Sequence, residues 1–149
     1  MRTILFAALC LMSFSSKADF VINNTTSCEV KFQVGVDRSG GCSYYNAIVP
    51  TTILPGATIV YANPSVIPST SWVFTPTPIA SDVFTWLRVY PSTGTCPGTG
   101  NQVSGSCGPF TMGPVSMTTY DASLGCASCG TTNIEWTVVG PDIIVNIYP

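Results

Sequence analysis

Apolar side chains at every second position limit the folds that are open to this chain. Across residues 29–36 (EVKFQVGV), every second side chain is apolar, which is the spacing of a β-strand with one buried face. Similar short runs recur along the chain, separated by Gly, Pro, Asn and Ser, and none has the length and spacing of an amphipathic helix. Strands are expected over residues 20–22, 30–36, 44–49, 58–61, 71–74, 83–90, 115–120, 134–139 and 143–148.

Turn signals separate these segments at the short intervals that are typical of an all-β domain. Leu54-Pro55-Gly56 and Gly140-Pro141-Asp142 predict tight turns, whereas residues 91–109 predict a long loop rich in Gly, Ser, Thr, Cys and Pro. The pattern predicts a single small β-sandwich of about eight or nine short, mostly antiparallel strands, with a small β-barrel as the alternative.

Residues 1–18 predict a secretory signal peptide. Arg2 supplies a positive charge, residues 4–14 form an apolar run with Ser13 as its one polar residue, and Ser16 and Ala18 are small residues ahead of a cleavage site. The apolar run is shorter than the roughly 20 residues that cross a bilayer. We therefore expect cleavage after Ala18, no membrane insertion afterwards, and one domain over residues 19–149 that is secreted, periplasmic or on the cell surface.

Removal of residues 1–18 leaves few charges. Lys31, Arg38 and Arg88 remain against seven acidic residues, so the net charge of the mature chain is −4. Three cations cannot neutralise many phosphates, which disfavours nucleic acids and anionic membranes as partners.

Six cysteines remain after cleavage, and an oxidising compartment favours three disulfides among them. They are Cys28, Cys42, Cys96, Cys107, Cys126 and Cys129. Nearest neighbours (28–42, 96–107 and 126–129) are the expected pairs, because each bond then closes a short loop. The alternative ties the loop of residues 96–107 to the loop of residues 126–129.

Cys126 and Cys129 form a Cys-x-x-Cys pair, which also occurs in redox sites and zinc sites. No amphipathic helix follows the pair to lower a thiol pKa. The chain has no histidine to complete a zinc site. A structural role is therefore expected for both cysteines.

The absence of histidine also excludes Ser-His-Asp and Cys-His nucleophiles and His-ligated metal chemistry. A carboxylate pair, as in glycoside hydrolysis, is the remaining catalytic option. The candidate acids are Asp37, Asp82, Asp121, Glu135 and Asp142. Three of them fit turn or loop-edge positions, and Glu135 fits a solvent-facing strand position. We expect a protein without catalytic residues, cofactor or metal.

Residues 83–90 (VFTWLRVY) carry the strongest signal for binding. Alternation predicts a core face made of Val83, Thr85, Leu87 and Val89. The opposite face is then made of Phe84, Trp86, Arg88 and Tyr90. This aromatic face either packs under a loop or the second sheet, with Arg88 stacked on a ring, or forms an exposed platform for a sugar ring or a protein. The candidate ligand-binding residues are Trp86, Arg88, Tyr90 and Tyr44.

Two segments, VINNTTSCEVKFQV (residues 21–34) and LPGATIVY (residues 54–61), resemble the start of thaumatin-like and other secreted sandwich domains. Those domains also begin with a strand, Asn and Cys, followed by a Pro-Gly turn. The resemblance implies no specific function, since the larger cysteine set and the acidic cleft of thaumatin-like proteins have no counterpart in this sequence.

These features predict a non-catalytic secreted or cell-surface binding module that recognises a glycan or a surface protein through aromatic side chains. The alternative is a structural or assembly protein of the cell surface or extracellular matrix, in which sheet edges and a neutral surface support self-association.

Overall fold

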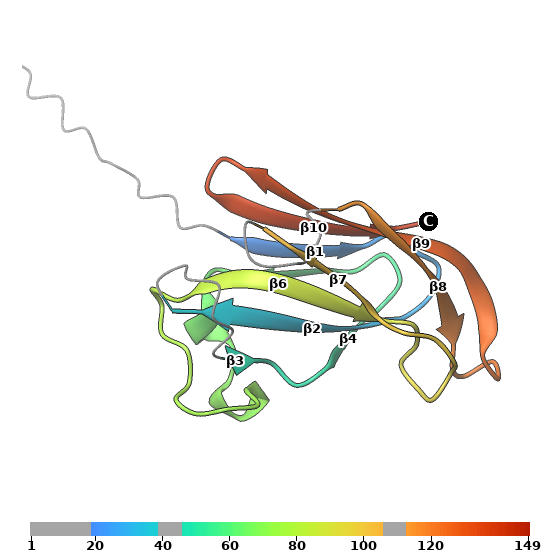
Figure 1. Ribbon diagram of the computed structural model, residues 1–149, viewed down its shortest axis with the longest axis horizontal. Helices are drawn as coiled ribbons and strands as arrows, with labels where there is room; N and C mark the ends of the chain where they lie inside the picture. The colour runs from blue at the N-terminus through green and yellow to red at the C-terminus, as the bar shows by residue number, and fades with distance from the viewer. Residues whose placement is uncertain (1–18, 39–45, 106–112) are drawn as a thin grey trace, which may run out of the picture.

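The computed structural model describes residues 19–38, 46–105 and 113–149, which form two packed β-sheets (Figure 1). The first sheet has the strand order β5–β1–β10–β9–β8, and the second has the order β3–β2–β6–β7, with β4 also paired to β2. The strands of the first sheet are β5 (Thr58–Tyr61), β1 (Phe20–Asn24), β10 (Asp142–Tyr148), β9 (Ala127–Val139) and β8 (Val115–Asp121). Those of the second are β3 (Asn46–Ala47), β2 (Val30–Asp37), β6 (Val83–Tyr90), β7 (Asn101–Ser104) and β4 (Thr51–Ile53). Two 3-10 helices, η1 (Pro64–Val66) and η2 (Ser69–Ser71), lie between β5 and β6.

The predicted all-β sandwich is confirmed, and the two sheets do not close into the alternative barrel. Among the described strands, every pair is antiparallel except β1 with β10, the first and last of them.

Both predicted tight turns are present. The N–H of Ala57 donates to the carbonyl of Leu54 (3.1 Å) across Pro55-Gly56, which closes the turn between β4 and β5. Gly140-Pro141 joins β9 to β10, and Gly140 has a φ of 61°. A two-residue hairpin loop of this kind needs a positive φ at its first position, which glycine adopts without strain.

The core lies between the sheets and is built from the inward-facing residues of the longer strands. Phe20 of β1 is fully buried and stacks on Phe84 of β6, with ring centroids 4.5 Å apart. Trp136 of β9 packs against the same Phe20 at 5.4 Å. Because each buried large side chain stabilises a fold by about 1.5–3 kcal/mol, this aromatic cluster is a principal link between the two sheets.

Several of the strand predictions differ from the structure: β4 (Thr51–Ile53) was not predicted, and β9 begins at Ala127 instead of residue 134. Residues 71–74 form no strand: η2 ends at Ser71, and Trp72 makes only an isolated bridge to Ile48. The expected loop of residues 91–109 contains β7, which sequence alternation cannot detect because Val103 is its only apolar residue. Of the expected strand over residues 44–49, only Asn46–Ala47 is a described strand.

A β-bulge in β6 changes the predicted faces of that strand. Gly35 pairs with Trp86 and Val36 pairs with Phe84, so Thr85 is an extra residue without its own partner on β2. The bulge reverses the alternation: Leu87 and Val89 face the core as predicted, but Phe84 is also in the core and Val83 is 39% exposed. The assignment of Val83 to the core face and of Phe84 to the opposite face was therefore wrong.

The predicted nearest-neighbour disulfides are also wrong. Cys28 is bonded to Cys129, and Cys96 is bonded to Cys126. Cys126 and Cys129 cannot pair with each other because β9 begins between them: three strand residues span about 10 Å, and bonded cysteines have Cα atoms roughly 4.4–6.8 Å apart. The alternative link between the loop of residues 96–107 and the loop of residues 126–129 is confirmed by the second bond. Cys42 and Cys107 lie outside the described residues.

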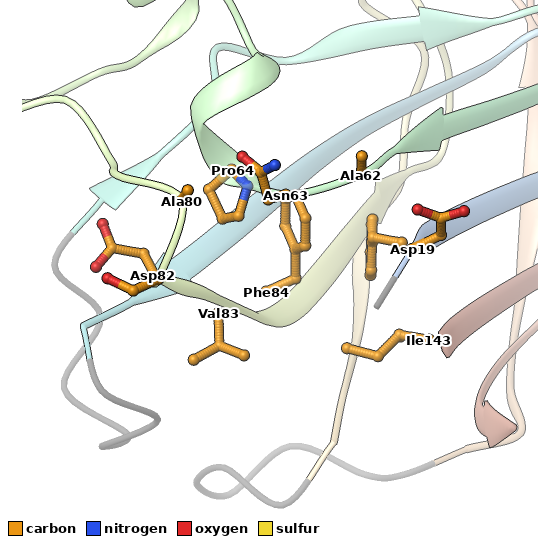
Figure 2. Close-up of a pocket in the computed structure, with 11 residues that line it drawn as sticks. Asp19, Ala62, Asn63, Pro64, Ala80, Asp82, Val83, Phe84 and Ile143 are labelled. Atoms are coloured by element: carbon orange, nitrogen blue, oxygen red, sulfur yellow. The ribbon is translucent and has the colours of Figure 1, made fainter. Parts of the chain in front are cut away.

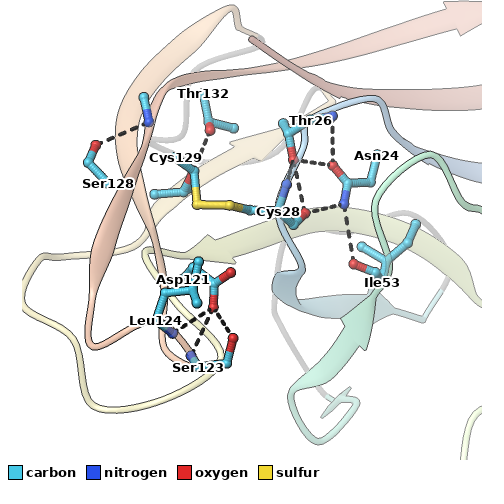
Figure 3. The surroundings of a disulfide bond; sticks show 12 residues. Asn24, Thr26, Cys28, Ile53, Asp121, Ser123, Leu124, Ser128, Cys129 and Thr132 are labelled. Carbon is cyan, nitrogen blue, oxygen red and sulfur yellow. Dashed lines mark hydrogen bonds between the residues drawn. A yellow bond between two sulfur atoms is a disulfide. The ribbon is translucent and has the colours of Figure 1, made fainter.

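Both bonds join parts of the chain that are far apart in sequence. Cys28 lies between β1 and β2, and Cys129 lies on β9 (Figure 3). Cys96 lies between β6 and β7, and Cys126 lies between β8 and β9. Stable structural disulfides indicate an oxidising environment of the extracellular type. No helix in the described ranges is long and apolar enough to cross a membrane.

Candidate functional site

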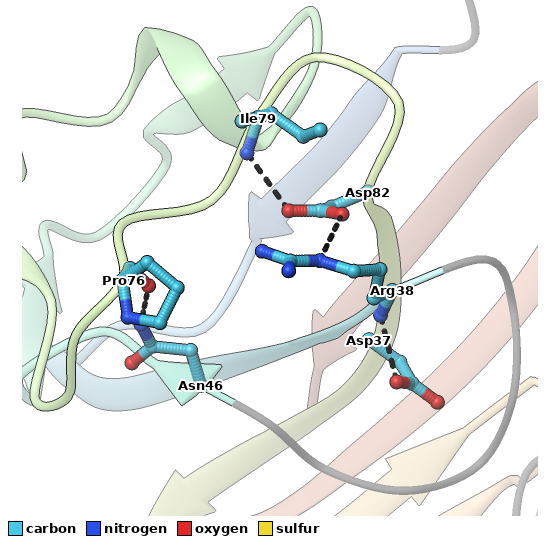
Figure 4. Close-up of polar contacts among 6 residues, drawn as sticks. All are labelled: Asp37, Arg38, Asn46, Pro76, Ile79 and Asp82. Carbon is cyan, nitrogen blue, oxygen red and sulfur yellow. Dashed lines mark hydrogen bonds and ion pairs between the residues drawn. The ribbon is translucent and has the colours of Figure 1, made fainter.

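Asp82, one of the predicted candidate acids, is buried beside the start of β6. Its Oδ2 accepts a hydrogen bond from the backbone N–H of Ile79 (2.8 Å), and its Oδ1 lies 3.7 Å from Nε of Arg38 (Figure 4). Arg38 follows β2, so the ion pair joins the end of β2 to the start of β6. The Asp82 carboxylate therefore links these two strand ends.

Asp121 organises the turn between β8 and β9, as the sequence predicts. Its Oδ1 accepts hydrogen bonds from the Ser123 hydroxyl (2.6 Å), the Ser123 amide (2.8 Å) and the Leu124 amide (3.3 Å) (Figure 3). These bonds, above all the one from the Ser123 hydroxyl, lower the pKa of the Asp121 carboxyl. The same turn holds Cys126, whose N–H donates to the Asp121 carbonyl.

The remaining acids occupy separate positions. Asp37 and Asp142 each accept a backbone N–H, from Arg38 (2.7 Å) and Asp19 (3.0 Å) respectively. Glu135 lies on β9 opposite Asn146. Across the part of the chain that the structure describes, no three His, Cys, Asp or Glu side chains gather into a metal-binding group.

A cavity of about 300 Å³ lies beside the start of β1, between the two sheets (Figure 2). Its lining is Asp19, Phe20, Ala62, Asn63, Pro64, Ala80, Ser81, Asp82, Val83, Phe84 and Ile143. Asp82 forms an ion pair with Arg38 and accepts a hydrogen bond from the Ile79 amide. The Asn63 side chain accepts a hydrogen bond from the Ser65 amide at the start of η1. These two polar groups therefore serve the local fold, and none of the predicted ligand-binding residues that the structure describes is in this lining.

The outer face of the second sheet brings cations, carboxamides and a tyrosine together. We call this surface the cationic face, and its members are Lys31, Gln33, Arg88, Tyr90 and Gln102. The register places Lys31 opposite Tyr90, Gln33 opposite Arg88, and Arg88 opposite Gln102. Directly opposed residues have Cβ atoms about 4.5–5.5 Å apart, and all five are at least partly exposed, so they form one continuous surface across β2, β6 and β7.

Tyr90 is held in position by its neighbours on this face. Its hydroxyl donates to Oε1 of Gln33 (2.9 Å), and Nε2 of Gln33 donates to the carbonyl of Ile48 (2.9 Å). Nζ of Lys31 lies 5.9 Å from the centre of the Tyr90 ring, within the range of a cation–π interaction. The ring is therefore oriented by two polar contacts and remains partly exposed.

The charge of the cationic face is opposite to that of the chain. Lys31 and Arg88 are two of the three cations that follow Ala18, against seven acidic residues. Among the described residues that pair across β2, β6 and β7 on this face, none is acidic. Glu29 precedes Lys31 in the connection before β2. A local positive surface on an acidic protein attracts anions.

Trp86 does not belong to an exposed platform. It is 9% exposed, and a Cβ added to Gly35 on β2 would overlap its ring. Phe84 packs in the core, as expected if the aromatic residues pack against the second sheet instead of forming an exposed platform. Arg88 is exposed, and Tyr90 is partly exposed. Two of the four candidate ligand-binding residues thus meet at the surface, and Tyr44 lies outside the described residues.

Sequence reasoning missed Lys31, Gln33 and Gln102 as members of this face. The alternation of β2 predicts that Lys31 and Gln33 point away from the core, but it does not reveal which strand lies beside them. Gln102 lies on β7, which was not predicted.

Comparisons of the chain with protein-family models, with curated proteins and with solved structures find no match.

Proposed function

We propose that the protein is an exported, non-catalytic module that binds an acidic polysaccharide on its cationic face. The observation that carries the proposal is the partly exposed Tyr90 ring, which Gln33 orients and which lies on one sheet face with Lys31 and Arg88. A tyrosine offers an apolar surface with a polar edge. Arginine can bind a carboxylate through two parallel hydrogen bonds.

The shape of the face supports a polymer rather than a small molecule. It lies on the open side of a sheet and spans β2, β6 and β7, so its groups are spaced across strands about 4.8 Å apart. The partly exposed carboxamides of Gln33 and Gln102 flank Arg88 and can donate to and accept from sugar hydroxyls. The positive charges suit the carboxylates of a chain of uronate sugars, and the tyrosine ring and the carboxamides suit its sugar rings and hydroxyls.

Export is part of the same proposal. The order of charge, apolar run and small residues in residues 1–18 supports a cleaved signal peptide. The two disulfides support folding in an oxidising compartment. An extracellular module with this face would meet polysaccharides of cell walls, capsules or matrices.

Binding to polygalacturonate, with its fully methyl-esterified form as the matched neutral polymer, tests the proposal. Affinity electrophoresis or calorimetry is expected to show binding to the acidic polymer only, weakening as salt rises. Lys31→Gln and Arg88→Gln are each expected to weaken binding about five- to tenfold. Tyr90→Ala is expected to lower affinity by a similar factor.

Two variants serve as controls on intact protein. Arg38→Gln removes the same charge away from the face, although it also removes the ion pair with Asp82, and Tyr148→Ala removes a partly exposed tyrosine from β10 of the other sheet. Thermal unfolding verifies that each variant is folded. Equal losses in Arg38→Gln and Arg88→Gln would refute the assigned site. Absence of binding together with concentration-dependent oligomers would favour the assembly protein instead.

A further inference from the structure

We propose that the α-amino group created by cleavage between Ala18 and Asp19 forms an ion pair with Asp142, which fastens the first strand to the last. The inference rests on the expected cleavage position and is independent of polysaccharide binding. In the structure, the Asp19 nitrogen donates a hydrogen bond to Oδ1 of Asp142 at 3.0 Å. Cleavage converts that amide nitrogen into an ammonium at the same place.

The surroundings of Asp19 hold this nitrogen next to the carboxylate. The Asp19 carbonyl accepts the N–H of Ile143 (2.9 Å), so Asp19 is bonded on both sides to consecutive residues of β10. Asp142 is the first residue of β10 and pairs with Val139 across the tight turn from β9. Phe20, the next residue of the chain, is fully buried against Phe84. Both partners of the proposed pair are therefore placed by ordered backbone.

The local charges favour an ammonium at this position. The Asp19 carboxylate belongs to the same residue as the new amine, and the Asp142 carboxylate accepts its hydrogen bond. Across the cavity from Asp19 lies Asp82 (Figure 2), which is paired with Arg38. Tyr61, on the neighbouring strand, is opposite Phe20. The amine therefore donates to the Asp142 carboxylate and has the carboxylate of its own residue nearby. An ammonium donates stronger hydrogen bonds than a neutral amide.

The geometry is specific to a chain that begins at Asp19. Each additional residue in extended conformation moves the charged end by about 3.3 Å. In a chain that begins earlier, only the uncharged N–H of Asp19 donates a hydrogen bond to Asp142. Mature protein is consequently more stable than the same domain with a preceding peptide bond. Because the folded state favours the charged amine, this stabilisation is present below the amine's unfolded titration midpoint and is lost as pH rises through the folded midpoint.

The chain permits a direct measurement of this amine. Lys31 is the only lysine after Ala18, so Lys31→Arg in a chain that begins at Asp19 leaves a single primary amine. Reductive ¹³C-methylation then labels one group whose NMR shift reports its protonation. The midpoint is expected to lie at least about 0.5 pH units higher with Asp142 than in Asp142→Asn. Identical midpoints in two folded proteins would overturn the proposal.

A second measurement separates the ion pair from a merely structural role of Asp142. Unfolding by urea is compared for Asp142→Asn in two forms of the domain: one begins at Asp19, and the other retains Ala18 with its α-amine acetylated. The substitution is expected to cost more in the form that begins at Asp19 at pH 7, and this excess is expected to vanish once the amine is deprotonated. Equal costs at every pH would contradict the ion pair, as would a natural mature terminus other than Asp19 in mass spectra of exported protein.

Discussion

Among single residues, Asn24 shows how a buried polar side chain stabilises this fold. Its Nδ2 has two hydrogens, which are shared among the carbonyls of Cys28 (2.9 Å), Ile53 (3.2 Å) and Leu54 (3.1 Å). Its Oδ1 accepts from the amide and hydroxyl of Thr26 (Figure 3). These bonds join the end of β1 to the end of β4, across the two sheets. Such a network is stable only while every buried group keeps a partner.

Replacement of this side chain is therefore expected to be costly. Asn24→Ala leaves buried carbonyls without a donor and is expected to lower the free energy of unfolding by about 2–4 kcal/mol in urea titrations. Asn63→Ala is the matched control, because Asn63 accepts two bonds from Ser65 in a more exposed position. Its expected cost is about 1 kcal/mol. Similar losses in the two variants would contradict the importance of burial.

Among the structural elements, β6 contains a bulge that lets two different alternation patterns share one strand. On one side of Thr85, Phe84 faces the core; on the other side, Leu87 and Val89 do so. Trp86, Arg88 and Tyr90 consequently lie together on the opposite face. The bulge thus serves both the aromatic core cluster and the cationic face.

Deletion of Thr85 is expected to be tolerated, because Phe84 and Trp86 then become consecutive and both keep their present faces. The expected loss is below about 2 kcal/mol, with near-native near-ultraviolet circular dichroism. Deletion of Arg88 is the control. It shifts the alternation within β6, turns core side chains outward and is expected to cost several kcal/mol or abolish folding. A folded Arg88 deletion with the same stability as the Thr85 deletion would refute this account.

In the molecule as a whole, each described disulfide joins two segments that are not paired directly with each other as neighbouring strands. Cys28–Cys129 closes a loop with a sequence separation of 101, and Cys96–Cys126 closes one of 30. Both bonds restrict the unfolded chain, and the restriction grows with the logarithm of loop length.

The two bonds are expected to differ in their contribution to stability. Replacement of both Cys28 and Cys129 by Ser is expected to cost about 5 kcal/mol, and replacement of both Cys96 and Cys126 about 3.5 kcal/mol. Urea unfolding of the two double variants under non-reducing conditions measures the difference. A larger loss for the shorter loop would show that local packing in the turn between β8 and β9 outweighs chain entropy.

Local sequence is sufficient to predict most of the strands, the oxidising environment and the two tight turns. Alternation in β2 and most of β6, and glycine at residues 56 and 140, are local properties, because side-chain direction in a strand and positive φ depend only on neighbouring residues. Alternation also places Arg88 and Tyr90 on one face of their strand.

Which distant residues meet is a property of the folded molecule alone. Lys31 lies opposite Tyr90 because β2 pairs with β6 in one register, and Cys28 reaches Cys129 because β1 enters the sheet beside β10. The extra residue at Thr85 likewise has no signature in the strand itself, since a bulge is defined by its partner strand. The physical reason is that register and sheet order depend on the packing of the complete core, in which every strand competes for the same buried surface.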